Sequence, residues 1–182
     1  MNVIASKGQL RASFMRWALF TVPLIVLLGY FGGQAGGPDT FWFRSLVKPD
    51  IFPPFAVFGI VWTILYVMIG LSLALVASAW GARGRGIALV LFVIQLALNL
   101  SWTYVFFGTQ SIENALIVIA VLSFFVVLTV IAFWRVRRAA ALLMLPYLAW
   151  VLFATFLTYE FHRLNPEGGM QERPAETQRI EL

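Results

Sequence analysis

Long uncharged stretches, rich in Leu, Val, Ile and Phe, alternate with short basic clusters along this chain. The uncharged stretches cover residues 17–38, 51–82, 86–112, 114–134 and 139–159. A helix of about 20 apolar residues spans the hydrocarbon core of a bilayer, and it satisfies its own backbone polar groups there. The pattern therefore predicts an all-α integral membrane protein with five transmembrane helices.

We expect one transmembrane domain over residues 1–163. Its helices are predicted at residues 14–31, 55–80, 86–107, 112–134 and 139–162. Residues 164–182 are polar, with alternating charges and two prolines. A segment of this composition cannot bury enough apolar surface to fold, so a disordered tail is expected.

The connection between the first two helices, residues 32–54, is too long for a passive link in a compact bundle. Its interior is apolar and aromatic, and Pro49, Pro53 and Pro54 stiffen the approach to the second helix. We expect this segment to fold as a lid over the mouth of the bundle. The alternative is an interfacial aromatic anchor that lies beside the bundle.

Composition and charge agree with a membrane location. Residues of the AVILMFWYC set make up 61% of the chain and charged residues 12%, and the mean hydropathy is +0.87. The net charge of +5 comes mainly from basic clusters at the ends of predicted helices. This is the pattern of the positive-inside rule rather than of a nucleic-acid-binding surface. It places the N-terminus inside and the C-terminus outside, and leaves open whether the membrane is an inner or an outer one.

The sequence offers little conventional catalytic or metal-binding chemistry. It has no cysteine and a single histidine, His162, so disulfides, cysteine metal sites and histidine clusters are excluded. No pair of carboxylates lies at membrane depth, so acid–base hydrolysis is not expected. We expect no cofactor and no metal.

The third predicted helix carries polar and aromatic side chains on one face. Gln95, Asn99, Trp102 and Phe106 follow at steps of 4, 3 and 4 residues. Amides at membrane depth are costly against lipid, so they must face protein, water or a ligand. For Gln95 we favour an interhelical hydrogen bond; for Asn99 this interpretation and a ligand contact stay open.

Four tryptophans lie in the lid, in the outer halves of the second and third predicted helices and near the middle of the fifth. The other three lie beside basic clusters, where they would anchor helices at the interface. The first four are Trp42, Trp62, Trp102 and Trp150. Each of them alone is explained by packing, but together with two amides beneath one lid they predict an aromatic ligand cavity. Flat walls with few charges suit a large, flat, apolar ligand such as a tetrapyrrole or a sterol.

Three motifs carry a resemblance to a known family. The pattern W-x3-L-x-K-P-x3-P-P-x3-F-x3-W-x3-Y begins at Trp42, QLALNLSWTYVFFG begins at Gln95, and PYLAWVLFATFLTYEFHRLN begins at Pro146. In this order they resemble the tryptophan-rich sensory protein or translocator protein family (TspO/MBR), also called the peripheral benzodiazepine receptor family. The resemblance implies a pocket among five helices, capped by the loop between helices one and two, that takes porphyrins, sterols and benzodiazepine-type drugs. It also implies homodimers.

The resemblance and the helix faces together give a set of expected ligand-binding residues. By motif, Trp42, Trp62 and Trp150 match the family's porphyrin-associated tryptophans. The expected set is Trp42, Trp62, Tyr66, Asn99, Trp102, Phe106, Tyr147, Trp150 and Ala154. Phe43, Phe55 and Thr158 differ from the residues common in the family, which puts ligand preference in doubt.

Near the end of the last predicted helix, Leu157, Tyr159 and Arg163 fit a proposed cholesterol-contact pattern. The alternative is that the tyrosine and the arginine anchor the helix at the interface. Of these two readings we favour the anchor.

The expected function is a membrane receptor or translocator that binds porphyrin, and also sterol-like molecules, with a transport or sensory role. The alternative is a metal-independent enzyme that degrades porphyrin by light-driven or oxidative chemistry through Trp62 and Trp150. A plain membrane scaffold is the third possibility. The expected partners are the small molecule, membrane lipid and a second copy of the chain, with no nucleic acid.

Overall fold

The computed structural model describes residues 6–37 and 39–168. Within them the protein is an all-α bundle without strands. Its elements are α1 (Lys7–Gly32), a 3₁₀ turn (Gly33–Ala35), α2 (Phe41–Ser45), α3 (Phe55–Ala77), α4 (Arg85–Thr103), a π-helical turn (Tyr104–Gly108), α5 (Ile112–Val136) and α6 (Arg138–Leu164). Five helices in the described residues are long and apolar enough to cross a membrane, which confirms the predicted fold class.

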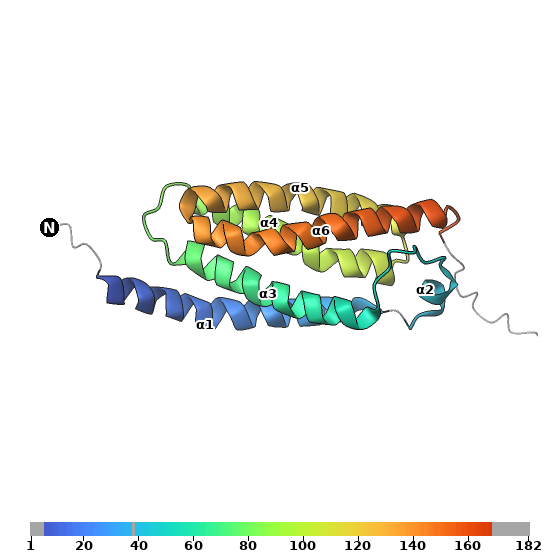
Figure 1. The fold of residues 1–182 in the computed structure, drawn as a ribbon, viewed down its shortest axis with the longest axis horizontal. Coiled ribbons are helices and arrows are strands. Elements are labelled where there is room, and N and C mark those ends of the chain that lie inside the picture. The colour runs from blue at the N-terminus through green and yellow to red at the C-terminus, as the bar shows by residue number, and fades with distance from the viewer. Residues whose placement is uncertain (1–5, 38, 169–182) are drawn as a thin grey trace, which may run out of the picture.

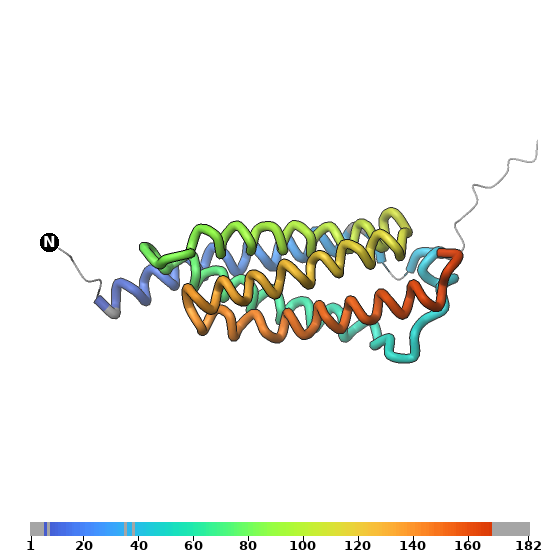
Figure 2. Tube along the Cα trace, turned by 90° about the horizontal axis from the view of Figure 1, so that it is seen from above, coloured from blue at the N-terminus to red at the C-terminus, as the bar shows by residue number. Residues whose placement is uncertain are grey.

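The long helices run along one axis, and the short helix α2 lies at the end of the bundle where α6 ends (Figures 1 and 2). α5 packs between α4 and α6, while α1 packs mainly on α3 and touches α4 lightly. We call the end where α1 begins the basic end and the opposite end the lid end. Both clusters of buried apolar residues lie between these helices, the second one beneath the lid.

Helix bounds differ from the predicted ones chiefly at the basic end. α1 begins at Lys7 rather than at residue 14, because Ser6 and Gln9 form a reciprocal capping box. α3 ends at Ala77 rather than at residue 80. Most of the tail that we expect to be disordered, residues 169–182, lies outside the described residues.

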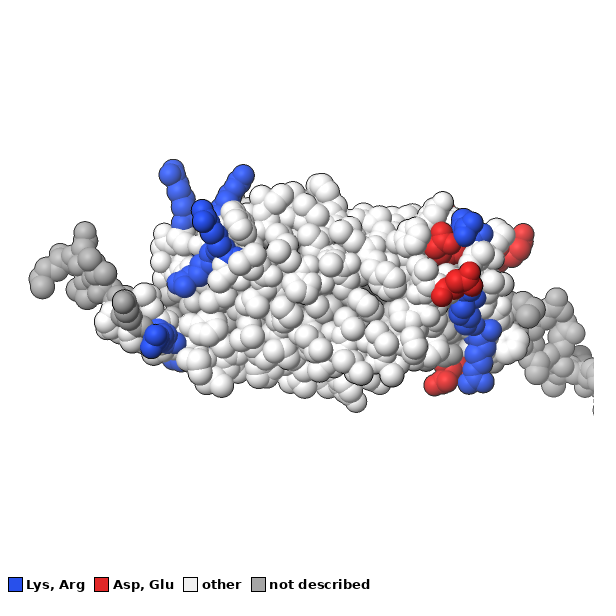
Figure 3. All heavy atoms as spheres, viewed as in Figure 1, with Lys and Arg blue, Asp and Glu red and all other residues white. Residues whose placement is uncertain are grey.

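Arg85 closes the basic end of α3. Its Nε and Nη2 donate to the carbonyl oxygens of Val76 (3.3 Å) and Ala77 (2.8 Å) in the last turn of the helix, where carbonyl groups lack the usual intrahelical partner. Its guanidinium also lies 4.4 Å from the centre of the Trp80 ring. Among the charged side chains that Figure 3 shows, those at this end are all basic, whereas the lid end carries both acidic and basic side chains, as the charge pattern of the sequence predicts.

Small residues bring α1 and α3 into close contact. A Cβ atom placed on Gly70 would lie 2.7 Å from the Cα atom of Val22, and one on Gly29 would overlap the ring of Tyr66. Beside Gly70, the hydroxyl of Thr21 donates to the Gly70 carbonyl oxygen at 2.8 Å. Without a hydrophobic driving force between helices in lipid, close backbone packing of this kind holds membrane helices together.

Replacement of Gly70 by alanine should therefore destabilise the bundle. The new methyl group must displace the α1 backbone at Val22, at a cost of about 1–3 kcal/mol. Thermal unfolding in detergent micelles should show a lower midpoint for Gly70→Ala. The control Gly59→Ala is on the same helix but meets nothing within 4 Å, so it should unfold at the wild-type temperature or above. Equal midpoints for the two variants would contradict the close contact.

Candidate functional site

A cavity of about 540 Å³ lies inside the lid half of the bundle. This size is within the range of about 300–1,000 Å³ that is typical of small-molecule sites. All five long helices and the lid contribute to its wall, which is mainly aromatic and aliphatic. The predicted site residues in the wall are Trp62, Tyr66, Asn99, Trp102, Phe106, Trp150 and Ala154.

Two of the expected ligand-binding residues lie behind the wall instead. The Trp42 side chain is 1% exposed, and its Nε1 donates to the Gly168 carbonyl oxygen at 2.7 Å. The Tyr147 side chain is fully buried, and its hydroxyl donates to Gln95 Oε1 at 2.8 Å. Both side chains support residues that line the cavity, because Trp42 packs edge-on against Phe106 at 5.5 Å and the Tyr147 ring lies 6.3 Å from that of Trp62.

Polar groups gather at the deep end of the cavity. The Tyr66 hydroxyl donates to Asn99 Oδ1 at 3.0 Å and so joins α3 to α4. The Trp62 ring stacks on the Tyr66 ring, with centroids 5.2 Å apart and planes 26° apart. Asn99 therefore makes the interhelical hydrogen bond and also lines the cavity, while its contact with a ligand stays a prediction. The bond from Tyr147 confirms the interhelical role predicted for Gln95.

Two indole groups in the wall have buried N–H donors without a partner. Among the described residues, no acceptor lies within hydrogen-bonding distance of Trp102 Nε1 or Trp150 Nε1. Trp102 is held by stacking on Phe106, with centroids 5.1 Å and planes 20° apart, and Trp150 packs edge-on against Phe58 at 5.7 Å. A buried donor without a partner costs free energy, so an acceptor atom on a bound ligand would relieve that cost.

The wall also contains residues that the sequence did not single out for the site. They include Phe43 and Phe52 of the lid region, Phe58 of α3, Gly29 near the end of α1, and Gly33 and Gln34 of the 3₁₀ turn. Phe43 is 2% exposed, and its ring contacts those of Phe52 (6.0 Å) and Phe106 (6.2 Å). The glycines have no side chain that could indicate a site, and α1 has no polar face to mark which side faces inward.

Lys48 stabilises the lid through hydrogen bonds to its backbone. Its Nζ donates to the carbonyl oxygens of Phe43 (2.6 Å), Leu46 (2.9 Å) and Arg44 (3.0 Å), which lie at the end of α2. Desolvation lowers the pKa of the Lys48 ammonium from its ordinary value, and the three carbonyl oxygens compensate the charge in place of water. The Lys48 ammonium thereby caps the C-terminal end of α2, a helix too short to be stable on its own.

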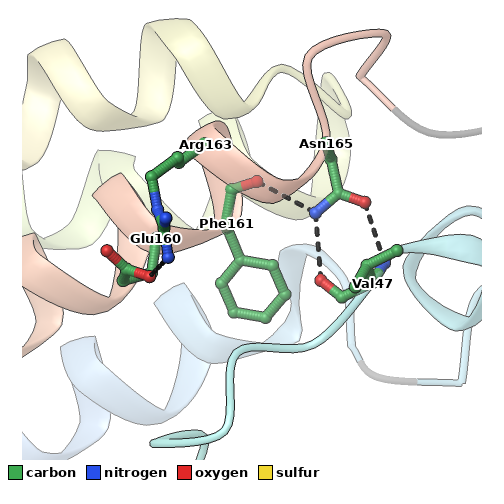
Figure 4. A network of polar contacts seen from close by, with 5 residues as sticks. All are labelled: Val47, Glu160, Phe161, Arg163 and Asn165. Carbon is green, nitrogen blue, oxygen red and sulfur yellow. Dashed lines mark hydrogen bonds and ion pairs between the residues drawn. The ribbon is translucent and has the colours of Figure 1, made fainter.

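Asn165 fastens the lid to the end of α6 (Figure 4). Its Oδ1 accepts from the Val47 N–H at 2.8 Å, and its Nδ2 donates to the Val47 carbonyl oxygen at 3.0 Å. The same Nδ2 donates to the Phe161 carbonyl oxygen at 2.9 Å. The connection is therefore a lid docked over the mouth, as predicted, and not an anchor beside the bundle.

The structure does not bring the three residues of the sterol pattern together. Leu157 is 5% exposed and lines the cavity, whereas Tyr159 is 49% exposed on the outside of the bundle. Arg163 forms an exposed ion pair with Glu160 at 2.6 Å. Residues two positions apart point to opposite sides of a helix, so Leu157 and Tyr159 cannot contact one sterol molecule side by side. The arrangement matches the interfacial anchor that we favoured.

Five membrane-crossing helices around a lidded aromatic cavity define a small, multi-pass integral membrane protein with a ligand-sized site. The sequence profile of the TspO/MBR family matches residues 20–164, and the chain belongs to this family.

Individual relatives support the same assignment. The chain is 42% identical over 158 residues to the tryptophan-rich protein TspO of Chlorobaculum tepidum, which covers 84% of this chain and 100% of the relative. It is 39% identical over 156 residues to the tryptophan-rich sensory protein of Cereibacter sphaeroides, covering 83% and 94%. It is 37% identical over 142 residues to the translocator protein of Homo sapiens, covering 76% and 84%.

Asn165→Ala should loosen the lid. The substitution removes both hydrogen bonds to Val47 and leaves two backbone groups of the lid without their partner. Hydrogen exchange of the backbone amides in residues 40–52 should become faster, by about 5- to 30-fold for a loss of about 1–2 kcal/mol. Glu160→Gln is the matched control, because it breaks only the exposed ion pair one turn away. Unchanged exchange in Asn165→Ala would show that the lid is held without this bond.

Proposed function

We propose that this protein binds a tetrapyrrole of the porphyrin type in the cavity beneath the lid, and that binding serves transport or sensing across the membrane. The observation that carries the proposal is the aromatic cavity of about 540 Å³ with two buried, unpartnered indole N–H donors in its wall. A porphyrin complements this wall, because its flat π surface packs against aromatic rings and its ring nitrogen atoms offer the acceptors that the two indole donors lack.

The aromatic pairs of the wall suit a flat ligand. Trp62 with Tyr66, and Trp102 with Phe106, form two stacked pairs on α3 and on α4 with its π-helical turn. Stacked and edge-on contacts with a further aromatic ring are favourable by about 0.5–1.5 kcal/mol each. A sterol would fill the same apolar space, but it offers one hydroxyl and no π surface. We therefore place porphyrin first and sterol-like ligands second.

The relatives bear on the role rather than on the ligand. One is named a sensory protein and another a translocator protein, and we extend these two roles to this chain as a proposal. A homodimer stays a prediction of the family resemblance.

Removal of the unpartnered indole donors tests the binding site. Trp102→Phe and Trp150→Phe keep an aromatic ring but lose the N–H, so each should weaken protoporphyrin IX binding by about 3- to 10-fold. Binding is measured in detergent by the shift of the porphyrin absorption band, because tryptophan fluorescence itself changes in these variants. The control is Trp134→Phe, whose ring is 48% exposed at the basic end. If all three variants bind protoporphyrin IX with the same affinity, the indole N–H donors do not contribute to binding.

Porphyrin degradation is the second candidate, favoured by one observation. The Trp62 ring stacks directly on Tyr66, whose hydroxyl donates to Asn99, so an oxidisable aromatic pair with a hydrogen-bond acceptor lies in the wall. In this candidate reaction, light excites the porphyrin, dioxygen is the oxidant, and the aromatic residues pass electrons.

Illumination of the protein–porphyrin complex in air separates binding from degradation. If the protein degrades its ligand, the porphyrin absorption should bleach faster than in detergent alone. Trp62→Phe should then slow the bleaching by about 10-fold or more, while the affinity measured in the dark changes less. If the bound porphyrin bleaches no faster than free porphyrin but still binds in the dark, the protein does not degrade it, and only the receptor role remains.

A further inference from the structure

The cavity is exposed on one side only. Its wall residues on α4, α5 and α6 and in the lid are buried or half-buried. The exposed wall residues all come from the end of α1 with its 3₁₀ turn and from the first turns of α3, and they are Tyr30, Gly33, Gln34, Phe55, Gly59 and Thr63. We call this gap between α1 and α3 the lateral aperture.

Glycine contacts explain why α1 and α3 separate there. The two helices touch at Gly70 and again at Gly29. Beyond Gly29, α1 leans on α4 instead, since a Cβ atom on Gly32 would lie 3.0 Å from Leu100 and one on Gly36 would overlap Phe107. α3 does not move toward α4 with α1, and space is left between α1 and α3. A Cβ atom on Gly33 or on Gly59 would therefore meet nothing within 4 Å.

The other routes into the cavity are closed. Over the mouth, Trp42, Phe43 and Leu46 are 1%, 2% and 3% exposed. The lid that carries them is tied to α6 through Asn165. The other neighbouring helices, α3 with α6, α6 with α5 and α5 with α4, are in contact, and at the cavity α1 meets α4 at Gly32.

The lateral aperture lies at membrane depth. Tyr30 belongs to the apolar span Gly8–Gly32, and Phe55, Gly59 and Thr63 belong to the span Phe55–Ala77. Tyr30 is 63% and Phe55 47% exposed, as is usual for aromatic side chains at the border between lipid and headgroups. The aperture therefore lies at the border of the apolar spans, where a molecule would meet lipid chains and headgroups.

We propose that the ligand passes between the membrane and the cavity sideways, through the lateral aperture, without opening of the lid. This rests on the proposed function of the cavity. The ligand class is an amphiphile dissolved in the leaflet at the lid end. No charged residue is in the described wall of the cavity, and an unpaired buried charge is costly. The apolar ring system thus enters first, and carboxylates stay at the aperture near Gln34.

Blocking the aperture tests this route. Gly59→Phe should slow both association and dissociation of protoporphyrin IX by about 10-fold or more, with the dissociation constant changed by less than about threefold. Rates are measured by stopped flow, between porphyrin-loaded vesicles and the protein in nanodiscs. Gly86→Phe is the matched control, because Gly86 also meets nothing within 4 Å but lies at the basic end of α4.

A second variant blocks the aperture only after the protein has folded, so an effect on folding cannot explain its result. The chain has no cysteine, so Thr63→Cys offers one thiol, which a bulky maleimide modifies after the protein has folded. Modification should slow porphyrin exchange, whereas modification of Ile117→Cys, at a lipid-facing position of α5 that is 56% exposed, should not.

The outcomes separate the two proposals. Unchanged exchange rates in Gly59→Phe and in modified Thr63→Cys overturn the lateral route, and faster exchange in Asn165→Ala would then assign the path to the lid. If wild-type protein in detergent does not bind porphyrin, the proposed function itself fails.

Discussion

The hydrocarbon core of a bilayer offers no hydrogen-bond partner to a polar group. Polar side chains of this protein therefore form hydrogen bonds between helices. Thr21 bonds to the backbone of α3, Ser72 donates to the Ala140 carbonyl oxygen at 2.8 Å, and Tyr147 reaches Gln95. The first two bonds join helices at a small residue, Gly70 or Ala140, which allows close approach, and the third joins two longer side chains. The bundle is thus held by a few polar contacts between tightly packed small surfaces.

Three buried side-chain donors of the described residues lack a hydrogen-bond partner, and two of them lie in the cavity wall. Trp102 and Trp150 keep buried N–H groups without an acceptor among the described residues, and the stacking of Trp102 on Phe106 fixes one of them. The π-helical turn Tyr104–Gly108 widens the end of α4 at this place, and such turns are frequent at functional sites. The third unpaired donor, Gln95 Nε2, lies behind the wall, whereas the two indole donors lie where an acceptor atom of a ligand would reach them.

Closure and access depend on different parts of the chain. The lid is a local structure, capped by Lys48 and tied to α6 by Asn165, so it can stay shut while the bundle beside it remains open. The opening arises because α1 leaves α3 beyond Gly29 and follows α4. Under the proposed function, a protein built in this way would shield its ligand from water at the lid end and exchange it with the lipid at the side.

The sequence alone determined the class, the five spans, the lid and much of the wall, because hydropathy, proline positions and aromatic spacing are local properties of a helix. It could place Trp62 and Asn99 on inward faces, but not tell that Trp42 lies behind the wall. Only the tertiary structure decided that, together with the tie at Asn165 and the aperture at Gly59. These depend on which helix each glycine or amide meets, and that is set by packing between segments far apart in the chain.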